Sequence, residues 1–354
     1  MIILATNHRK GRKMFYFWDM IQENISLLPF NTFGIDVRAK RFAPFKSVTD
    51  LAQILAHRND DELLVLGGGS NLLLTQDFDG LVIRNEIEGF SVIEESENHV
   101  DIKVGAGVVW HDFVMQCIDQ NYGGVENLSL IPGSVGASPM QNIGAYGVEI
   151  KDVFKSLEAY HIASGEIHHF DRAACAFGYR ESVFKRALKG QYVIISVTFT
   201  LTKKHQLNSS YGAIEAELAH QNITTPTIRD ISNAVIAIRK SKLPDPAEIG
   251  NSGSFFKNPV VDKTVLEAIQ EKWENVPNYP ASGDQVKLAA GWLLEQAGWK
   301  GKTFGTYGVH KKQALVLVNY GGTPGNAIFD LSSEIIADIE SKFGVTLERE
   351  VNVI

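Results

Sequence analysis

The sequence contains very little cysteine. Cys117 and Cys175 are the only two among 354 residues, too few for the disulfide framework of a secreted domain. Core-like residues flank both of them, so we expect inert buried thiols rather than nucleophiles. This usage indicates a reducing compartment, and we expect the protein in the cytoplasm.

Long apolar runs and an excess of positive charge are also lacking. No apolar stretch reaches the ~18 residues that span a bilayer, so we expect no membrane partner. The net charge of −7 argues against a general nucleic-acid binder, although a local basic pocket is compatible with it. Hydrophobic residues make up 44% of the chain, as in a folded soluble protein, and the length allows two or three domains.

Several catalytic motifs are missing as well. The ten histidines include no H-E-x-x-H spacing and the cysteines no paired spacing, so we expect no metal site. No Gly-x-Ser-x-Gly elbow occurs, which argues against an esterase triad. The chemistry of this chain must therefore be sought in its glycine-rich and charged segments.

The N-terminal segment does not have the pattern of a signal peptide. A short apolar start at residues 1–5 precedes a basic cluster at residues 9–13, which is the reverse of the order in a secretory signal. Met14 and Met20 are candidate internal starts. We expect residues 1–19 to be a disordered extension or a mis-assigned start, which the intact mass of the natively expressed protein would test.

The hydrophobic pattern predicts an α+β fold without internal repeats. Thr49 is the expected N-cap of a first helix, and Asp284 is the expected cap of a helix whose apolar stripe runs from Val286 to Ala297. Gly344 is expected just after the last helix. Further helices are predicted at 109–118, 228–238 and 328–343, and strands at 62–66, 72–74, 100–104, 192–201 and 314–318.

Residues 131–147 are dense in glycine and proline but also apolar. Val135, Met140, Ile143 and Tyr146 favour burial, while the glycines and prolines exclude a regular helix or strand. A buried irregular segment needs partners for its backbone N–H groups, and a ligand lying flat on the main chain can supply them. The alternative is an ordered loop that only connects strands.

Residues 67–71, Gly-Gly-Gly-Ser-Asn, directly follow a predicted strand. Three glycines allow successive N–H groups to turn toward one point, as in a phosphate-binding nest. The segment is neither a Walker loop nor a Rossmann fingerprint, because the Lys-Ser/Thr and the last glycine are missing. The alternative is a tight turn between two strands.

Five charged or hydroxyl residues stand out in the remaining segments, each with a structural alternative. Arg180 can bind a carboxylate or phosphate, or form a surface ion pair. Arg239 and Lys242 can clamp a diphosphate, or only complement a helix dipole. Ser254 can donate a proton if neighbours tune it, or cap a turn. Glu350 can face inward, or lie on the solvated side of a strand.

Together these segments resemble the UDP-N-acetylenolpyruvoylglucosamine reductase family. The matching motifs occur in the family's order and cover nearly everything from about residue 25 to the end. A retained Tyr211-Gly212 and the insertion up to Lys242 resemble the longer, type I branch. The motifs lie at residues 31–34, 67–71, 131–147, 177–182, 243–246, 253–259, 309–315 and 350.

The resemblance implies an FAD-binding fold of the vanillyl-alcohol oxidase type, with a C-terminal α+β domain that covers the substrate. It places an N-terminal FAD-binding domain at residues 20–88 plus the final strand 346–354. A central FAD-binding domain would span 89–238 and the substrate domain 239–345. The final strand would return to the N-terminal domain and bring Glu350 to the flavin.

The resemblance also implies the reaction, UDP-N-acetylmuramate dehydrogenase. NADPH would reduce a non-covalent FAD, which would pass hydride to the enolpyruvyl ether of UDP-N-acetylglucosamine enolpyruvate. Arg180 would stabilise the resulting negative charge, Glu350 would position the carboxyl group, and Ser254 would supply the proton. We expect a monomer that makes a precursor of peptidoglycan.

The remaining site residues are carried over from the family's motifs. The expected cofactor-binding residues are Gly67, Gly68, Gly69, Ser70, Asn71, Leu72, Pro132, Gly133, Gly136, Ala137, Ser138, Asn142, Ile143, Gly144, Ala145 and Arg239. The expected substrate-binding residues are Tyr146, Tyr211, Lys242, Asn258 and Gln313.

Two other readings compete with the reductase. A flavin oxidase of the same fold would often tether FAD through His or Cys, and the flavin-facing motifs here offer no obvious tether. The second alternative is a nucleotide-sugar binding protein that has lost its catalytic activity. The presence of Arg180, Ser254 and Glu350 together argues against it, because binding alone does not require all three. Acid precipitation distinguishes such an oxidase from the reductase, because a covalently bound flavin stays in the protein pellet.

Overall fold

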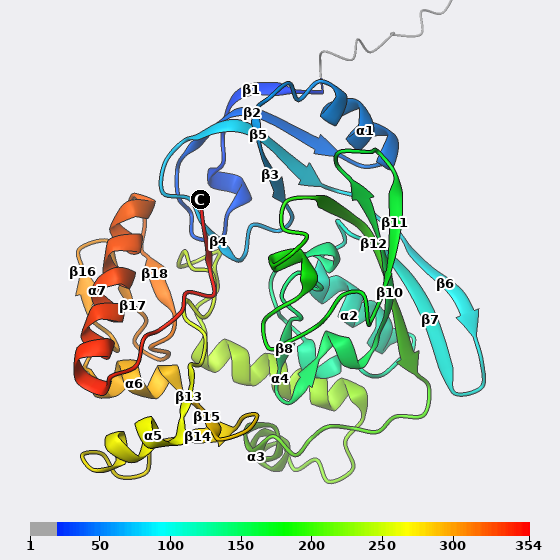
Figure 1. Ribbon diagram of the computed structural model, residues 1–354. Helices are drawn as coiled ribbons and strands as arrows, with labels where there is room; N and C mark the ends of the chain where they lie inside the picture. The colour runs from blue at the N-terminus through cyan, green and yellow to red at the C-terminus, as the bar shows by residue number, and fades with distance from the viewer. Residues whose placement is uncertain (1–19) are drawn as a thin grey trace, which may run out of the picture.

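The computed structural model describes residues 20–354 (Figure 1). The predicted extension or mis-assigned start at residues 1–19 lies outside this range. The first sheet has the strand order β1-β2-β5-β3, in which β2, β5 and β3 run parallel and β1 is antiparallel. Its strands are β1 (Gln22–Ser26), β2 (Arg38–Phe45), β3 (Glu62–Leu66) and β5 (Phe78–Asn85).

The first helix, α1 (Val48–Ala56), packs on this sheet through Leu51 and Ile54. The predicted cap at Thr49 is wrong, because Ser47 is the N-cap. The Ser47 hydroxyl accepts a hydrogen bond from the Asp50 N–H at 3.1 Å. Ser47 has an extended backbone three residues before that donor, which is the geometry a cap needs.

The second sheet is antiparallel, with the order β11-β10-β12-β7-β6. One face packs against α2 (Trp110–Asp119) around Trp110, Phe113 and Phe199, whose rings are in mutual contact. The predicted strand at 192–201 is confirmed as β12. The strands are β6 (Phe90–Glu95), β7 (His99–Gly105), β10 (Phe154–His161), β11 (Ile167–Asp171) and β12 (Tyr192–Thr202).

Two helices follow this sheet. In α4 (Ile228–Lys242), Thr227 and Asp230 form a reciprocal capping box, and the apolar face packs on α3 (Gly212–His220). The predicted helix at 228–238 is therefore confirmed and extends to Lys242.

The C-terminal part combines two small sheets with three helices. The helix predicted from Asp284 is wrong over its first turn: β15 (Gln285–Leu288) pairs with β13 and β14, and the helix begins only at Ala290. The last helix is confirmed as α7 (Gly325–Phe343), with Gly344 left-handed at its end (φ 66°). The other elements are β13 (Val260–Asp262), α5 (Lys263–Gln270), β14 (Asn278–Pro280), α6 (Ala290–Gln296), β16 (Thr303–Phe304), β17 (Tyr307–Val309) and β18 (Leu317–Asn319).

The chain end returns to the N-terminal part (Figure 1). β19 (Asn352–Val353) pairs in parallel with β4 (Leu72–Leu73), directly after the glycine loop at residues 67–71. One hydrophobic core joins residues of β2 and β5 with residues of α6, α7 and the last segment. The short hairpin of β8 (Gly144–Ala145) and β9 (Val148–Glu149) lies within the glycine-rich segment. No helix within residues 20–354 is both long and apolar enough to cross a membrane.

Candidate active site

A cavity of about 540 Å³ lies where the glycine loop, the 131–145 segment and the C-terminal loops meet. Residues from seven separate parts of the chain line it, so the fold brings most of the predicted site together. The predicted residues that line it are Gly67, Gly68, Gly69, Ser70, Asn71, Leu72, Pro132, Ala137, Ser138, Ile143, Gly144, Ala145, Arg180, Arg239, Ser254 and Glu350.

The loop at residues 67–71 provides free backbone donors. No hydrogen bond among the described residues uses the N–H groups of residues 68–71. A Cβ on Gly68 would lie 2.8 Å from Gly133 Cα, and one on Gly69, at φ 61°, would lie 2.0 Å from Phe30 O. Only glycine permits this approach, which leaves consecutive donors at the cavity wall. Such a nest fits an anionic group such as a pyrophosphate.

The 131–147 segment satisfies part of its backbone within the protein. The N–H groups of Val135 and Gly136 donate to Val108 O and Ala106 O, both at 2.9 Å. Asn142 is buried, and its amide donates to Glu149 Oε2 and Gly178 O, both at 3.0 Å. Gly133, Gly136 and Asn142 therefore support the cavity wall and do not line the cavity itself.

Arg180 extends over this wall from a left-handed backbone position (φ 55°). Its Nη2 donates to Gly144 O at 2.8 Å, and its Nε lies 3.0 Å from Glu350 Oε1. Within residues 20–354 this buried Nε–H has no acceptor in hydrogen-bond geometry, so its contact with Glu350 is an ion pair only. The hydroxyl of Ser182 donates to Met140 O at 2.7 Å and ties the Arg180 loop to the 131–147 segment.

Glu350 is a buried carboxylate among cations, with 13% of its side chain exposed. Burial raises its pKa above the usual range, and the charges of Arg180, Lys185 and Lys257 oppose that shift without reversing it. Its N–H donates to Phe255 O at 2.8 Å. This bond aligns the C-terminal segment with the loop that carries Ser254.

Ser254 is held in place by its neighbours and not by its own hydroxyl. Ser254 forms a backbone bridge with Val316, and the N–H of Phe255 donates to Leu315 O at 2.7 Å. The Ser254 side chain is half-buried, and within residues 20–354 its hydroxyl has no hydrogen-bond partner. The hydroxyl is thus available to a bound molecule.

Arg239 combines burial with an unused donor. It faces the cavity from the last turn of α4, and its buried Nε has no partner among the described residues. Burial lowers the pKa of the guanidinium. A buried cation with a free N–H at a cavity wall fits an anionic or carbonyl group of a ligand.

The five predicted substrate residues do not line this cavity. The rings of Tyr146 and Tyr211 meet edge to face, 5.4 Å apart between centroids. Lys242 is exposed at the end of α4. Asn258 Oδ1 accepts from the Ala290 N–H at 3.0 Å, and Gln313 Oε1 from the Leu315 N–H at 3.4 Å.

Several residues that line the cavity were not predicted from the sequence, among them Trp110, Gln141 and Lys185. Gln141 lies inside the glycine-rich segment, but a loop glutamine carries no local signal of function. Lys185 follows the Arg180 motif by five residues, and burial lowers its pKa. Its position on a short 3₁₀ turn at Val183–Lys185, not a motif, brings it to the cavity.

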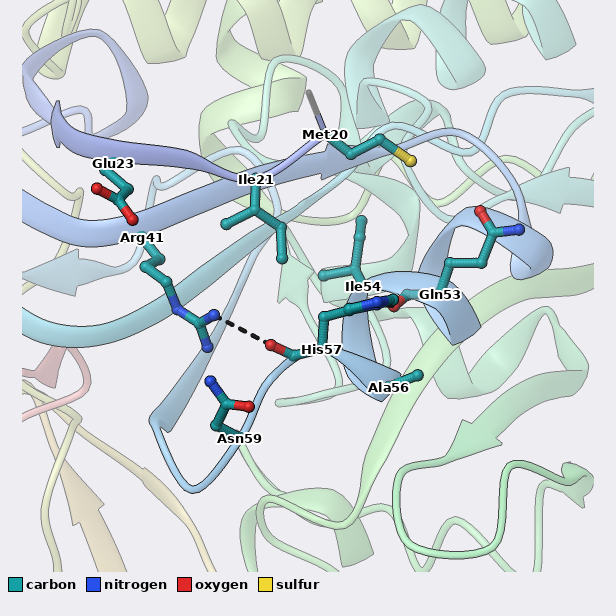
Figure 2. A pocket seen from close by; sticks show the side chains of 9 residues that line it. All are labelled: Met20, Ile21, Glu23, Arg41, Gln53, Ile54, Ala56, His57 and Asn59. Carbon is teal, nitrogen blue, oxygen red and sulfur yellow. Dashed lines mark hydrogen bonds between the residues drawn. The ribbon is translucent and has the colours of Figure 1, made fainter. Parts of the chain in front are cut away.

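A second cavity, of about 440 Å³, lies between β1, β2 and α1 (Figure 2). None of the predicted site residues lines it. Arg41 crosses it and donates to His57 O at 3.0 Å, so this cation already serves the fold. We therefore place the candidate site in the first cavity.

Both cysteines are buried, as expected. Burial raises the pKa of the Cys117 thiol, and it raises that of Cys175 to about 12. Neither thiol has the lowered pKa of a nucleophile.

Comparison with known proteins first gives the class. Residues 40–171 match the family model of an FAD binding domain. The chain therefore carries an FAD-binding domain, and the predicted α+β fold class with such a domain is confirmed.

Further matches give the family. Residues 245–354 match the model of the UDP-N-acetylenolpyruvoylglucosamine reductase C-terminal domain. The UDP-N-acetylenolpyruvoylglucosamine reductases of Flavobacterium johnsoniae and Amoebophilus asiaticus are 53% and 50% identical to this chain. Each match covers 94% of this chain and 99% of the relative. The chain belongs to the UDP-N-acetylenolpyruvoylglucosamine reductase family and is an oxidoreductase.

A solved structure supports the fold independently. The crystal structure of the reductase from Thermus caldophilus matches with a TM-score of 0.65 at 21% identity. The match covers 94% of this chain and 98% of that one. The whole arrangement of the described residues thus follows one known fold.

Proposed function

We propose that this chain reduces the enolpyruvyl ether of UDP-N-acetylglucosamine enolpyruvate to UDP-N-acetylmuramate, with NADPH as co-substrate, in the cytoplasm and as a monomer. The observation that carries the proposal is the meeting of Arg180, Ser254 and Glu350 at one cavity beside an unused backbone nest. The proposed domain limits are 20–88 with 346–354, 89–238 and 239–345.

The cavity fits a non-covalent FAD. The free N–H groups of residues 68–71 suit its pyrophosphate, and Arg239 offers a buried unpaired donor to another polar group of the cofactor. The main chain of residues 131–145 would cover the cofactor. When bound, FAD supplies the hydride that the substrate receives.

Arg180 and Glu350 bind and orient the substrate carboxyl group. Arg180 lines the cavity, and its buried Nε has no hydrogen-bond acceptor within residues 20–354, so its guanidinium would place a positive charge where negative charge develops on that group. A fixed donor in a water-poor site stabilises such charge strongly, because it needs no reorganisation during the reaction. The raised pKa of Glu350 suits it to share a proton with the carboxyl group or to polarise it.

Ser254 donates the proton. Its hydroxyl has no partner within the described residues, and the loop around it is fixed on both sides by backbone hydrogen bonds. A neutral hydroxyl is a weak acid, so the cations near Glu350 must stabilise the alkoxide that remains. Away from the reacting carbon, we assign the sugar diphosphate and its rings to Tyr146, Tyr211, Lys242, Asn258 and Gln313.

The test is stopped-flow spectroscopy of the FAD-loaded protein with the variant Ser254→Ala. We expect reoxidation of the reduced flavin by the enolpyruvyl substrate to slow by at least ~100-fold, while reduction by NADPH is largely unchanged. Ser164→Ala, in the exposed turn after β10, is the matched control. Equal losses in both half-reactions would contradict the assigned role.

The wild-type protein tests the function itself. A reduced flavin that the enolpyruvyl substrate does not reoxidise would refute the proposed substrate. Yellow colour left in the pellet after acid precipitation would show a covalent flavin and favour an oxidase of the same fold.

A further inference from the structure

We propose that Gln141 is a positioning residue that sets the orientation and protonation of the Glu350 carboxylate, and that Asn71 in turn holds Gln141. The inference rests on the proposed function, because Glu350 acts there on the substrate. It adds the Gln141 side chain to that site and gives Asn71, already expected at the cofactor, a second role.

The evidence is a relay of hydrogen bonds across three segments of the chain. Asn71 Nδ2 donates to Gln141 Oε1 at 2.9 Å, and Gln141 Nε2 donates to Glu350 Oε1 at 3.4 Å. Asn71 Nδ2 also lies 3.3 Å from the backbone oxygen of Glu350, to which it donates. The same asparagine thus fixes both the backbone of Glu350 and the partner of its side chain.

The first bond of the relay decides the direction of the second. An amide has a donor end and an acceptor end, and Asn71 occupies the acceptor end of Gln141. Gln141 must therefore turn its N–H groups toward Glu350. A glutamine without this constraint could rotate and place its oxygen against the carboxylate, which would repel the ionised form.

The relay also decides which carboxylate oxygen is free. Gln141 Nε2 and Arg180 Nε both approach Glu350 Oε1, at 3.4 and 3.0 Å. No hydrogen bond within residues 20–354 uses Oε2. We infer that the relay keeps Oε2 as the oxygen that meets the substrate.

A donor on the carboxylate favours its ionised form, whereas burial opposes that form. Removing the Gln141 amide should therefore raise the pKa of Glu350 further. The charged and titratable groups that act on this carboxylate are Arg180, Lys185, Lys257 and Tyr179, beside the neutral Gln141 amide.

The first experiment compares Gln141→Ala with the wild type as FAD-loaded proteins. We expect reoxidation of the flavin by the enolpyruvyl substrate to slow about tenfold, as for loss of a hydrogen bond to a charged group. The pH at half-maximal reoxidation rate should rise. FAD affinity and reduction by NADPH should stay within about twofold. Gln221→Ala is the matched control, because its exposed amide also donates to a glutamate, Glu217 Oε1, at 2.7 Å.

The second experiment separates positioning from direct contact. In a Glu350→Ala background, Gln141→Ala should cause no further loss, because the group through which it acts is gone. Equal losses in both backgrounds would overturn the inference. A drop in FAD affinity with unchanged reoxidation would also overturn it, since Gln141 would then be a cofactor ligand.

The third experiment does not depend on the substrate. Carbon-13 NMR of protein labelled at the glutamate carboxyl carbon, with Glu350→Ala as the assignment control, reports the pKa of Glu350 directly. Gln141→Ala and Gln141→Glu should both raise it, and an unchanged value in both would refute the relay. Failure of the proposed function shows instead as a wild-type flavin that the substrate cannot reoxidise.

Discussion

At the scale of single residues, the burial that suits Glu350 to its proposed function also lowers the stability of the folded protein. Its carboxylate lies near Arg180, Lys185 and Lys257, yet burial still raises its pKa. The ionised form is therefore less favourable in the folded chain than in the unfolded one. A residue kept under this penalty is typical of an active site.

The variant Glu350→Gln should stabilise the protein near neutral pH. A carboxyl with a raised folded-state pKa destabilises the fold progressively as pH rises above the unfolded pKa of about 4.3, and the penalty is complete once pH exceeds the folded-state pKa. We expect the melting temperature at pH 7 to rise by about 1–3 °C and the difference to close near pH 4.

Glu334→Gln, on the exposed side of α7, is the control and should show no such pH-dependent gain. A lower melting temperature of Glu350→Gln at pH 7 would mean that the ion pair with Arg180 outweighs burial. Thermal unfolding of the FAD-loaded proteins between pH 4 and 8 shows whether the burial penalty or the ion pair dominates.

At the scale of elements, the site depends on two irregular segments that approach at backbone distance. Gly68 meets Gly133 with no room for a side chain, and no hydrogen bond within residues 20–354 uses the N–H groups beside this contact. The strands β3 and β4 on either side of the loop hold its ends. The loop is therefore a rigid nest and not a flexible linker.

The variant Gly68→Ala should separate the two segments. Its Cβ would lie 2.8 Å from Gly133 Cα, and backbone cannot move aside cheaply. We expect FAD affinity, measured by flavin fluorescence, to fall at least tenfold, with a loss of about 1–3 kcal/mol in stability. Gly212→Ala is the control, because a Cβ there meets no atom within 4 Å. Wild-type affinity in Gly68→Ala would show that the nest does not hold the cofactor.

At the scale of the whole molecule, the last residues close the site. The N–H of Ile354 donates to Leu73 O at 2.9 Å, and the N–H of Thr75 donates to Ile354 O at 2.8 Å. These bonds attach the segment that carries Glu350 to the strand that follows the glycine loop. Core contacts of Leu347 and Val351 reinforce the attachment.

Deletion of residues 352–354 should therefore weaken both stability and chemistry. Loss of β19 removes a few backbone hydrogen bonds of about 0.5–1.5 kcal/mol each, and we expect the melting temperature to fall by about 5 °C. Reoxidation of the flavin should slow because Glu350 loses its anchor. Asn352→Ala keeps the backbone pairing and should behave much more like the wild type. A truncated protein with wild-type reoxidation kinetics would contradict this account.

Local physics explains which elements could be predicted. The helices at 228–242 and 325–343 carry their own apolar stripes and end signals, and β12 is a long β-prone run. The failure at 285–288 arose because Val286 and Leu288 fit both a helix and a strand pattern. These residues form a strand because they pair with β13 and β14. At Thr49 the error was a shift of two residues, because Ser47 is the hydroxyl residue that caps the helix.

The amino-acid sequence by itself determined the glycine nest, the long helices and strands, the buried thiols and the likeness to one family. Each of these depends on residues that are close together in the chain or on a pattern of motifs. Only the tertiary structure decided that Glu350 meets Arg180 and Gln141. Gln141 and Glu350 are 209 residues apart, and strand pairing together with a shared core brings them into contact. No local preference encodes such a contact, because its energy exists only after the distant segments have packed.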